Sequence, residues 1–398
     1  NGEEKMSISK GILEVLEKSS WIRKMFEEGI QLKQQYGEKK VFDLSLGNPL
    51  LEPPKKFKER IIDLSKSEEK GMHRYMPNPG FLSTRSAIAK NLNDEFSINI
   101  GSEHVIVTTG AAGGLNSVLK TLLNPDDEII IFSPFFVEYL FYVSNHNGKS
   151  VIAKTDENFL PDLVDLENKI TKKTKAVIIN SPNNPTGVLY PKEIIEKLSE
   201  VIKRSEKKLQ TEIYLVSDEP YRKIIFDDKK YPFIFNYHDR SIVVTSHSKD
   251  LGLAGERIGY IIVSPKDKDR EVLFDAIIFS LRTLGHVNAT AFMQRAIEDI
   301  QNESVDIDVY KKKRDFLYKE LTDIGYDCVK PEGAFYLFPK TPIEDDAKFV
   351  QELQKHKVLT VPGRGFGLGG YFRISYSVDD WVLEGSIKGF KEAYNSFK

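Results

Sequence analysis

Short apolar segments alternate with amphipathic ones through the middle of this chain, and this alternation is the feature that most limits its possible folds. The apolar segments, which we expect to form strands, are His104–Gly110, Glu128–Phe132, Lys175–Ser181, Glu212–Ser217, Ser241–Ser246 and Arg257–Val263. They are continuously apolar, as strands are when helices cover both faces of their sheet. The segments between them, such as Lys192–Ser205, place apolar residues three and four positions apart, which is typical of helices. The pattern predicts an α/β fold with a mainly parallel sheet.

The pattern changes after about Leu284. We expect long charged helices at Val287–Gln301 and Ile307–Ile324, and a final helix from Asp379 to about Ser396. Between them lies a short β cluster, which comprises Tyr326–Leu337, Val358–Val361 and Tyr371–Tyr376. The start of the chain is also helical in pattern and ends in the strand-like Val41–Leu46. We therefore expect a large α/β domain over residues 52–284 and a smaller α+β domain built from residues 1–51 and 285–398.

The composition argues against several classes of protein. The 398 residues include 57 basic and 59 acidic ones, so the concentrated basic face of a nucleic-acid-binding protein is not expected. A hydrophobic content of 40% argues against disorder. The most apolar stretch, Ile129–Val143, is interrupted by Pro134 and Glu138 and is too short to cross a bilayer. The single cysteine, Cys328, and the acidic start without an apolar leader favour a cytoplasmic protein.

A glycine-rich segment, Thr109–Gly114, follows one expected strand and precedes a helix expected over Asn116–Leu123. Its small residues let backbone N–H groups approach an anion at the N-terminus of a helix. The segment matches neither the Walker motif nor the GxGxxG fingerprint. Considered alone, it is a candidate phosphate site and is equally compatible with an ordinary tight turn.

Three further strands are followed by unusual polar loops. The first, SPNNPTG at 181–187, is stiffened by two prolines and presents side-chain amides. In the second, SDEPY at 217–221, Asp218 follows an apolar run, where a carboxylate costs free energy unless it meets a cation. The third, SHSK at 246–249, places Lys249 eight residues before Arg257. Ligands of doubly wound sheets bind at the carboxyl ends of the strands, so we expect these loops to form one site.

In their order and spacing, these segments resemble the pyridoxal-phosphate-dependent aminotransferases of fold type I, class I and II, the aspartate aminotransferase superfamily. The resemblance runs from Asp43, in DLSLGNP, to Arg373, in YFRIS, and includes SPNNPTG, SDEPYR and SHSKDLGLAGERIGY. It implies a large domain with a mainly parallel seven-stranded sheet between helices, plus a smaller α+β domain. The implied cofactor is pyridoxal 5′-phosphate. No metal is expected, because the seven histidines show no metal-ligand spacing.

The resemblance also assigns catalytic roles to three residues. Lys249 matches the lysine that holds the cofactor covalently and, once the substrate amine displaces it, acts as base and acid. Asp218 matches the acid that keeps the pyridine nitrogen protonated, and Tyr221 matches a donor to the phenolic oxygen of the cofactor. Asn184 matches the second donor to that oxygen and is also expected to contact the substrate.

The other cofactor contacts follow from the same resemblance. The residues expected around the phosphate are Gly110, Ala111, Ala112, Ser246, Ser248 and Arg257. Phe136 matches an aromatic residue that stacks on the cofactor, although the adjacent Phe135 leaves core packing open for it. Tyr75, in YMPNPG, matches a tyrosine that reaches the phosphate of the neighbouring subunit, which implies a homodimer with shared active sites.

On the substrate side, Arg373 matches the arginine that binds the α-carboxylate through two hydrogen bonds, a geometry that lysine cannot reproduce. Gly47 matches a backbone position that closes over the substrate, and Gly333–Tyr336 resembles a strand beside it. His247 adjoins the lysine motif, but strand alternation would point it away, so we expect it to be a packing residue.

These residues predict an aminotransferase that moves an amino group between an L-amino acid and a 2-oxo acid by a ping-pong mechanism. Aspartate with 2-oxoglutarate is the preferred pair, with alanine or aromatic amino acids as alternatives. Arg282 is a candidate for the second carboxylate of such a substrate, but no motif distinguishes it from a surface charge. A related C–S or β-elimination lyase could use the same cofactor residues. A DNA-binding regulator with this domain is disfavoured, because no basic recognition helix precedes Asp43.

Overall fold

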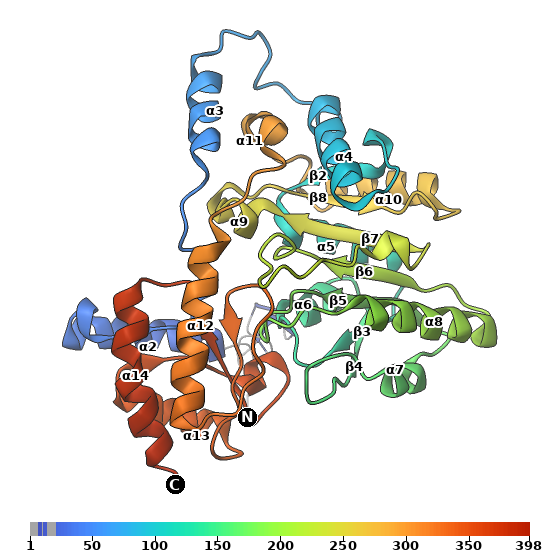
Figure 1. Ribbon diagram of the computed structural model, residues 1–398. Helices are drawn as coiled ribbons and strands as arrows, with labels where there is room; N and C mark the ends of the chain where they lie inside the picture. Colours follow the sequence, from blue (N-terminus) through green and yellow to red (C-terminus); the bar gives the residue numbers. More distant parts are fainter. Residues whose placement is uncertain (1–6, 10, 14–20) are drawn as a thin grey trace. The chain divides into compact units, whose positions relative to one another are not determined.

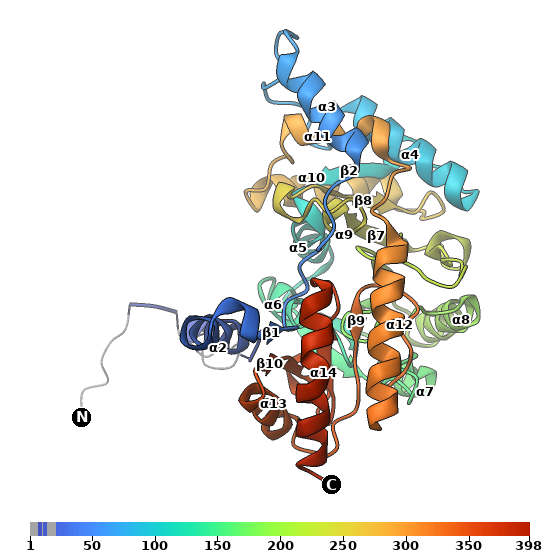
Figure 2. The same cartoon turned by 60° about the vertical axis from the view of Figure 1, so that its left-hand side comes forward.

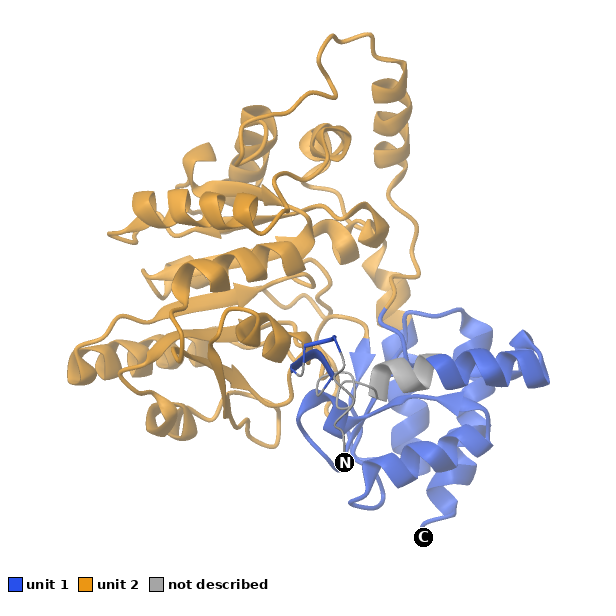
Figure 3. Ribbon diagram, turned by 180° about the vertical axis from the view of Figure 1, so that it is seen from behind, with its two compact units in different colours: residues 1–47, 313–328, 336–398 blue, residues 48–312, 329–335 orange. Residues whose placement is uncertain are grey.

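The computed structural model describes residues 7–9, 11–13 and 21–398. The chain forms two compact units (Figure 3). Unit 1 comprises residues 1–47, 313–328 and 336–398, and unit 2 comprises residues 48–312 and 329–335. One helix, α12 (Ile307–Ile324), begins in unit 2 and ends in unit 1. Among the described residues, every helix falls short of the length or the hydropathy that a bilayer crossing requires.

Unit 2 is built around a seven-stranded sheet with the order β2-β8-β7-β6-β5-β3-β4 (Figure 1). Its strands are β2 (Val105–Thr108), β3 (Glu128–Phe132), β4 (Lys149–Ala153), β5 (Thr174–Asn180), β6 (Tyr214–Asp218), β7 (Ser241–Ser246) and β8 (Gly259–Val263). Neighbours pair in parallel, except that β8 runs antiparallel to both β7 and β2. The expected α/β fold with a mainly parallel sheet is therefore confirmed. The six predicted strands are present, and β4 is the one that was missed.

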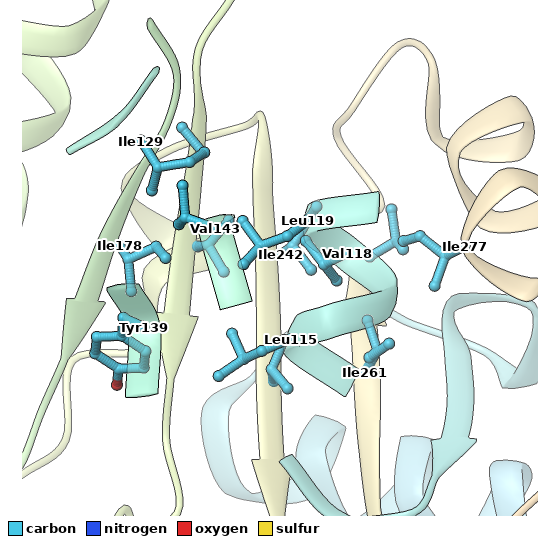
Figure 4. Close-up of a cluster of buried hydrophobic side chains, with 14 of the residues drawn as sticks. Leu115, Val118, Leu119, Ile129, Tyr139, Val143, Ile178, Ile242, Ile261 and Ile277 are labelled. Carbon is cyan, nitrogen blue, oxygen red and sulfur yellow. The ribbon is translucent and has the colours of Figure 1, made fainter. Parts of the chain in front are cut away.

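A hydrophobic core joins one face of this sheet to three helices (Figure 4). These are α5 (Gly110–Leu122), α6 (Glu138–Ser144) and α10 (Arg270–Thr283). Leu115 and Leu119 of α5 pack with Ile242 and Ile261 of the central strands. The strand residues that alternate with this set, such as Val243, are equally buried, as expected for a sheet covered on both faces.

The helix after the glycine-rich segment begins earlier than expected. We predicted a helix over Asn116–Leu123, whereas α5 starts at Gly110, so the glycines form its first turns. Glycine weakens a helix interior by roughly 1 kcal/mol relative to alanine, which is why the sequence pattern favoured a later start. Close packing explains these glycines, because a Cβ on Gly114 would lie 2.7 Å from Val244.

Other helices lie wholly within unit 2. They are α3 (Lys55–Lys66), α4 (Leu82–Phe96), α7 (Leu163–Lys169), α8 (Lys192–Leu209), α9 (His247–Asp250) and α11 (Ala291–Ile297). The predicted helix at Lys192–Ser205 corresponds to α8, which continues for four more residues, to Leu209, and ends where Gln210 adopts a left-handed conformation. The helix expected at Val287–Gln301 begins only at Ala291, because Gly285 and Val287 both have positive φ angles.

Residues 285–312 lie with unit 2 and not with the smaller domain to which the sequence assigned them. Their helix α11 packs against α3, and the two lie side by side in both Figures 1 and 2. The change in sequence pattern after Leu284 therefore reflects more highly charged helices and does not coincide with a boundary between the compact units.

Unit 1 joins both ends of the chain. Its elements are α2 (Trp21–Tyr36), β1 (Phe42–Asp43), β9 (Tyr336–Leu337), α13 (Asp346–Lys355), β10 (Val358–Leu359), β11 (Val361–Pro362), β12 (Phe372–Ser375) and α14 (Asp380–Asn395). β1 pairs in parallel with β10, and β12 lies between β11 and β9 in an antiparallel sheet. The predicted N-terminal helical region is described over α2, and residues 1–6, 10 and 14–20 lie outside the described residues.

Candidate active site

The sheet register brings the predicted loops to one edge of unit 2. Asn180, the last residue of β5, pairs with Asp218, the last residue of β6. Gly259, the first residue of the antiparallel β8, pairs with Ser246 on one side and with Thr108 on the other. The glycine-rich turn, the two polar loops, the lysine motif and Arg257 therefore meet at the carboxyl edge of the parallel strands, where ligands bind in such sheets.

Asp218 lies at the centre of this edge and is only 5% exposed. Its Oδ2 accepts a hydrogen bond of 2.5 Å from the hydroxyl of Tyr139, in α6. Its Oδ1 is buried and has no hydrogen-bond partner among the described residues. Burial raises the pKa of Asp218 to about 7, although the Tyr139 hydrogen bond acts in the opposite direction. A buried carboxylate oxygen without a partner indicates a place for a hydrogen-bond donor.

The SPNNPTG loop is held against Asp218 by its own backbone and side chains. Asn180 donates a hydrogen bond to the backbone oxygen of Asp218 at 2.9 Å. The Oδ1 of Asn180 in turn accepts the backbone N–H of Asn184 at 2.8 Å. Asn183 accepts from both the N–H and the hydroxyl of Thr186, and Ser181–Pro182 is a cis peptide. Asn184 is therefore placed close to Asp218 in a rigid, buried loop.

The first turn of α5 and Arg257 lie close together, and their donor groups are of the kind that can hold an anion. Gly110 has a φ of +77°, and a Cβ on it would lie 2.7 Å from Nη2 of Arg257. Arg257 is itself left-handed, with a φ of 52°, and donates from Nη1 to the backbone oxygen of Ala254 at 3.0 Å. The first N–H groups of a helix, here those of Ala111 and Ala112, have no acceptor within the helix. Ser246 and Ser248 lie at the adjacent strand end and are buried.

Lys249 is carried by α9, a single helical turn. His247, at the start of this turn, bonds through Nδ1 to Asp250 at 3.1 Å and is 1% exposed. Burial raises the pKa of Asp250, but His247 together with the cations Lys223 and Arg222 outweighs burial, and the pKa is lowered. His247 begins α9 and is not part of strand β7, so strand alternation does not set the direction of its buried side chain. The ammonium of Lys249 lies 5.5 Å from the ring centre of Phe335.

The aromatic residues predicted near the cofactor occupy different settings. Phe135 belongs to the hydrophobic core, whereas Phe136 is partly exposed and contacts Tyr139 edge-on with a 5.6 Å centroid distance. Tyr221 is buried and contacts Phe335 edge-on at 5.4 Å. Tyr75, by contrast, is 96% exposed.

Two of the residues predicted to bind the substrate, Arg373 and Gly47, lie in unit 1. Arg373 is 4% exposed and sits between the rings of Tyr336 and Phe366, each 4.6 Å from its guanidinium carbon. Its Nη2 donates to the backbone oxygen of Ser45 at 2.6 Å. Gly47 lies two residues further on, and a Cβ there would lie 1.9 Å from the hydroxyl oxygen of Tyr336. A larger residue at this position would therefore require the ring of Tyr336 to move.

Several contributing residues were not predicted. Tyr139 is separated from Asp218 by 79 residues, and its one signal in the sequence is a hydroxyl within the apolar helix FFVEYLFYV. Asn180 could have been noticed as a polar residue at the end of an apolar strand. Behind the site, Glu219 and Arg222 form a buried ion pair at 3.1 Å, and Arg222 also donates to Tyr260.

The other candidate residue, Arg282, has an ordinary surface setting. Arg282 is exposed on the last turn of α10, with its guanidinium over the ring of Phe279. No group of three or more histidine, cysteine, aspartate or glutamate side chains in the described part of the chain is arranged to hold a metal ion.

Known proteins resemble this chain over most of its length. Residues 39–388 match the model of the family described as aminotransferase class I and II. A probable aspartate aminotransferase from Methanocaldococcus jannaschii is 35% identical over 88% of this chain and 93% of its own length. A crystal structure of an aminotransferase from Eubacterium rectale has a TM-score of 0.96 and 36% identity, covering 99% of this chain and 100% of that one.

A structure of the Thermus thermophilus aspartate aminotransferase with maleate has a TM-score of 0.84 and 26% identity, and covers 98% of this chain and 100% of that one. The family match spans most of the 398 residues, and the M. jannaschii relative is matched over nearly its whole length. The chain therefore belongs to the class I and II aminotransferases, pyridoxal-phosphate enzymes of fold type I.

Proposed function

We propose that this aminotransferase binds pyridoxal 5′-phosphate at the carboxyl edge of the unit 2 sheet and uses L-aspartate as its amino donor and 2-oxoglutarate as the acceptor. The observation that carries the cofactor assignment is Asp218. Its Oδ1 is buried and has no partner among the described residues, so it is available to a protonated ring nitrogen. The cradle at Gly110 and Arg257 fits a phosphate, because the absent Cβ leaves room for the guanidinium.

In this proposal, each residue has a chemical task. Lys249 would attach the cofactor and, when released, take a proton from the substrate Cα and return it to the product. Asp218 would hold the ring nitrogen, and Asn184 and Tyr221 would donate to the phenolic oxygen. When bound, pyridoxal phosphate supplies an electron sink for the pair left behind as the Cα–H bond breaks. Phe136, Ser246 and Ser248 would contact the ring and the phosphate.

The substrate part of the proposal rests on unit 1 and on the relatives. Arg373 would bind the α-carboxylate, which aspartate, 2-oxoglutarate and their products all carry, and Gly47 would close over it. The M. jannaschii relative is named as a probable aspartate aminotransferase. The T. thermophilus structure holds maleate, which is a four-carbon dicarboxylate like aspartate. Both favour a dicarboxylic substrate.

We further infer that the protein is a homodimer and acts in the cytoplasm. The almost complete exposure of Tyr75 supports a site that a second subunit completes. The loop that carries Tyr75 is anchored within its own subunit, because Asn288 donates to the backbone oxygens of Pro77 and Asn78. The single cysteine, Cys328, with a pKa raised to about 12 by burial and by Asp327, suits a reducing compartment.

A half-reaction screen tests the proposed activity. The cofactor-loaded protein is mixed with each amino acid in turn, and the loss of its visible absorption band is followed as the cofactor becomes an amine. We expect aspartate to react with the highest kcat/KM and to release oxaloacetate. Preference for alanine or an aromatic amino acid would contradict the substrate assignment. Release of pyruvate and ammonia while the band persists would indicate a lyase instead.

A further inference from the structure

A short segment, residues 329–335, belongs to unit 2 although the chain on both sides of it belongs to unit 1. Backbone hydrogen bonds tie it to both polar loops of the candidate site. The N–H groups of Glu332 and Gly333 donate to Gly187, at the end of SPNNPTG, at 2.9 and 3.0 Å. The N–H of Ala334 donates to Ile224, just beyond SDEPYR, at 2.9 Å. The segment is therefore fixed to the loops that hold Asn184 and Tyr221.

The backbone of this segment is strained at the residue that precedes Phe335. Ala334 has a φ of 57°, a conformation that costs a residue with a Cβ about 1–2 kcal/mol. Gly333 packs so closely on Pro182 that a Cβ would lie 2.5 Å from its ring. Strain of this kind persists only where the surrounding contacts enforce it. Here the contacts fix the direction in which the next side chain, Phe335, leaves the chain.

Phe335 is fully buried and contacts three residues of unit 2. Tyr221 meets its ring edge-on at 5.4 Å, and Tyr310 packs on it at 5.3 Å. The hydroxyl of Tyr310 accepts the backbone N–H of Leu50 at 3.2 Å, which fixes the Tyr310 ring in turn. The third contact is the ammonium of Lys249, 5.5 Å from the ring centre.

We propose that Phe335 is a positioning residue for Lys249. The ring of Phe335 orients the amine of Lys249 beside Tyr221 and favours the protonated form of that amine. The inference rests on the proposed function, in which Lys249 attaches the cofactor. An aromatic face attracts an ammonium group by about 0.5–1 kcal/mol or more, whereas an aliphatic side chain of similar volume excludes water without this attraction. Phe335 therefore sets how much of the amine is free to attack the cofactor at a given pH.

The rate of cofactor attachment to the cofactor-free full-length protein tests this inference. The rate is measured against pH, and mass spectrometry after borohydride reduction verifies that Lys249 is the modified residue. Attachment requires the unprotonated amine, so the midpoint of the profile reports the pKa of that amine. We expect Phe335→Leu to lower the midpoint by about 0.4–0.7 pH unit, the equivalent of the lost attraction.

Phe338→Leu is the matched control. Phe338 is as buried as Phe335 but lies in unit 1, where it stacks on Tyr371 at 5.3 Å. Both variants lose a buried ring, but we expect the midpoint to move only when Phe335 changes. If Phe335→Leu does not fold, Phe335→Met, which is flexible and fills the space without a ring, should lower the midpoint in the same way.

The possible outcomes separate this inference from the proposed function. If the midpoint of the pH profile is unchanged or raised in the Phe335 variants, the positioning role is overturned. The same holds if Phe338→Leu shifts the midpoint by an equal amount. Both results would leave the proposed function intact. If the unaltered protein does not attach the cofactor at Lys249, the proposed function fails and this inference fails with it.

Discussion

At the scale of single residues, Asp218 is a buried carboxyl group, and its burial predicts how the protein's stability depends on pH. Its pKa of about 7 in the folded chain exceeds the ordinary value of 3.8. The fold therefore retains a proton that the unfolded chain loses, and stability falls as the pH rises from about 4 to 7. Above that range, the ionisation of buried Asp218 lowers the free energy of unfolding by on the order of 4 kcal/mol.

Asp218→Asn removes this cost while keeping an acceptor for Tyr139. The free energy of unfolding of the cofactor-free variant is compared with that of the unaltered chain. We expect the difference in favour of the variant to be about 3 kcal/mol larger at pH 8 than at pH 5. Urea unfolding at the two pH values measures the difference. Asp275→Asn, at an exposed position, serves as the control and should show no such gain. Equal gains for Asp218→Asn at both pH values would refute the raised pKa.

Arg373 predicts a change in kinetics and not in stability. The two rings that flank it favour a planar guanidinium over a compact ammonium. We expect Arg373→Lys to lower kcat/KM by roughly 100-fold for the amino acid and the oxo acid alike, because both lose a paired hydrogen bond to the α-carboxylate. Arg364→Lys, at an exposed ion pair of the same unit, should have little effect. A loss for only one of the two substrates would argue against the shared carboxylate site.

Sequence motifs identified the residues that lie at or just after the ends of strands, because each such residue follows an apolar run. Lys249, Asp218 and Asn184 were found in this way. The contact of Tyr139 with Asp218 and that of Phe335 with Lys249 were not predicted. The two residues of each pair are far apart in the sequence and meet only when the chain folds. The pKa of Asp218 was equally hidden, since it depends on burial that no local pattern records.

At the scale of elements, the start of α5 connects helix geometry to phosphate binding. Gly110→Ala would force a Cβ into a left-handed position at a cost of about 1–2 kcal/mol and push Arg257 aside. We therefore expect a stability loss of that size and a cofactor Kd raised by 10-fold or more, measured by urea unfolding and by fluorescence titration.

Gly255→Ala is the control for this change, because a Cβ at Gly255 meets nothing within 4 Å. It lies in the same motif, two residues before Arg257. We expect its cofactor affinity to remain that of the unaltered protein. If Gly110→Ala also binds the cofactor normally, the first turn of α5 does not form the phosphate cradle.

The strands were predictable because six of them are apolar runs between helices. The edge strand β4 escaped, since it includes the exposed Lys149 and the half-buried Ser150, which break the run. The early start of α5 and the late start of α11 were missed for a common reason. In both, backbone angles and tertiary contacts prevail over the local propensity of glycine and valine.

At the scale of the whole molecule, the sequence predicts that both ends of the chain build one smaller domain, and both ends belong to the compact unit 1. It placed residues 285–312 in that unit, whereas their packing on α3 puts them in unit 2. The short excursion of residues 329–335 into unit 2 was also missed, because its backbone pairs with loops more than a hundred residues away.

The proposed dimer predicts complementation between two inactive variants. A Tyr75→Ala subunit should no longer contact the cofactor phosphate in the site of its partner. A Lys249→Ala subunit should no longer attach the cofactor in its own site. In a mixed dimer, the Tyr75→Ala subunit keeps Lys249 and receives Tyr75 from its partner, which restores one complete site. We expect about half of the normal activity per dimer in differently tagged, co-purified mixtures. If Tyr75 served its own subunit, the mixed dimer would contain no complete site and recover nothing.

The central claim, that Lys249 holds pyridoxal phosphate in this aminotransferase, is tested most directly by mapping the attachment site. The cofactor-loaded protein is reduced with borohydride, digested and analysed by mass spectrometry. We expect the visible band to disappear and the pyridoxyl group to be found on Lys249, with no such adduct in Lys249→Ala. A stoichiometric adduct on a different lysine, or a reducible adduct that survives in Lys249→Ala, would contradict the account.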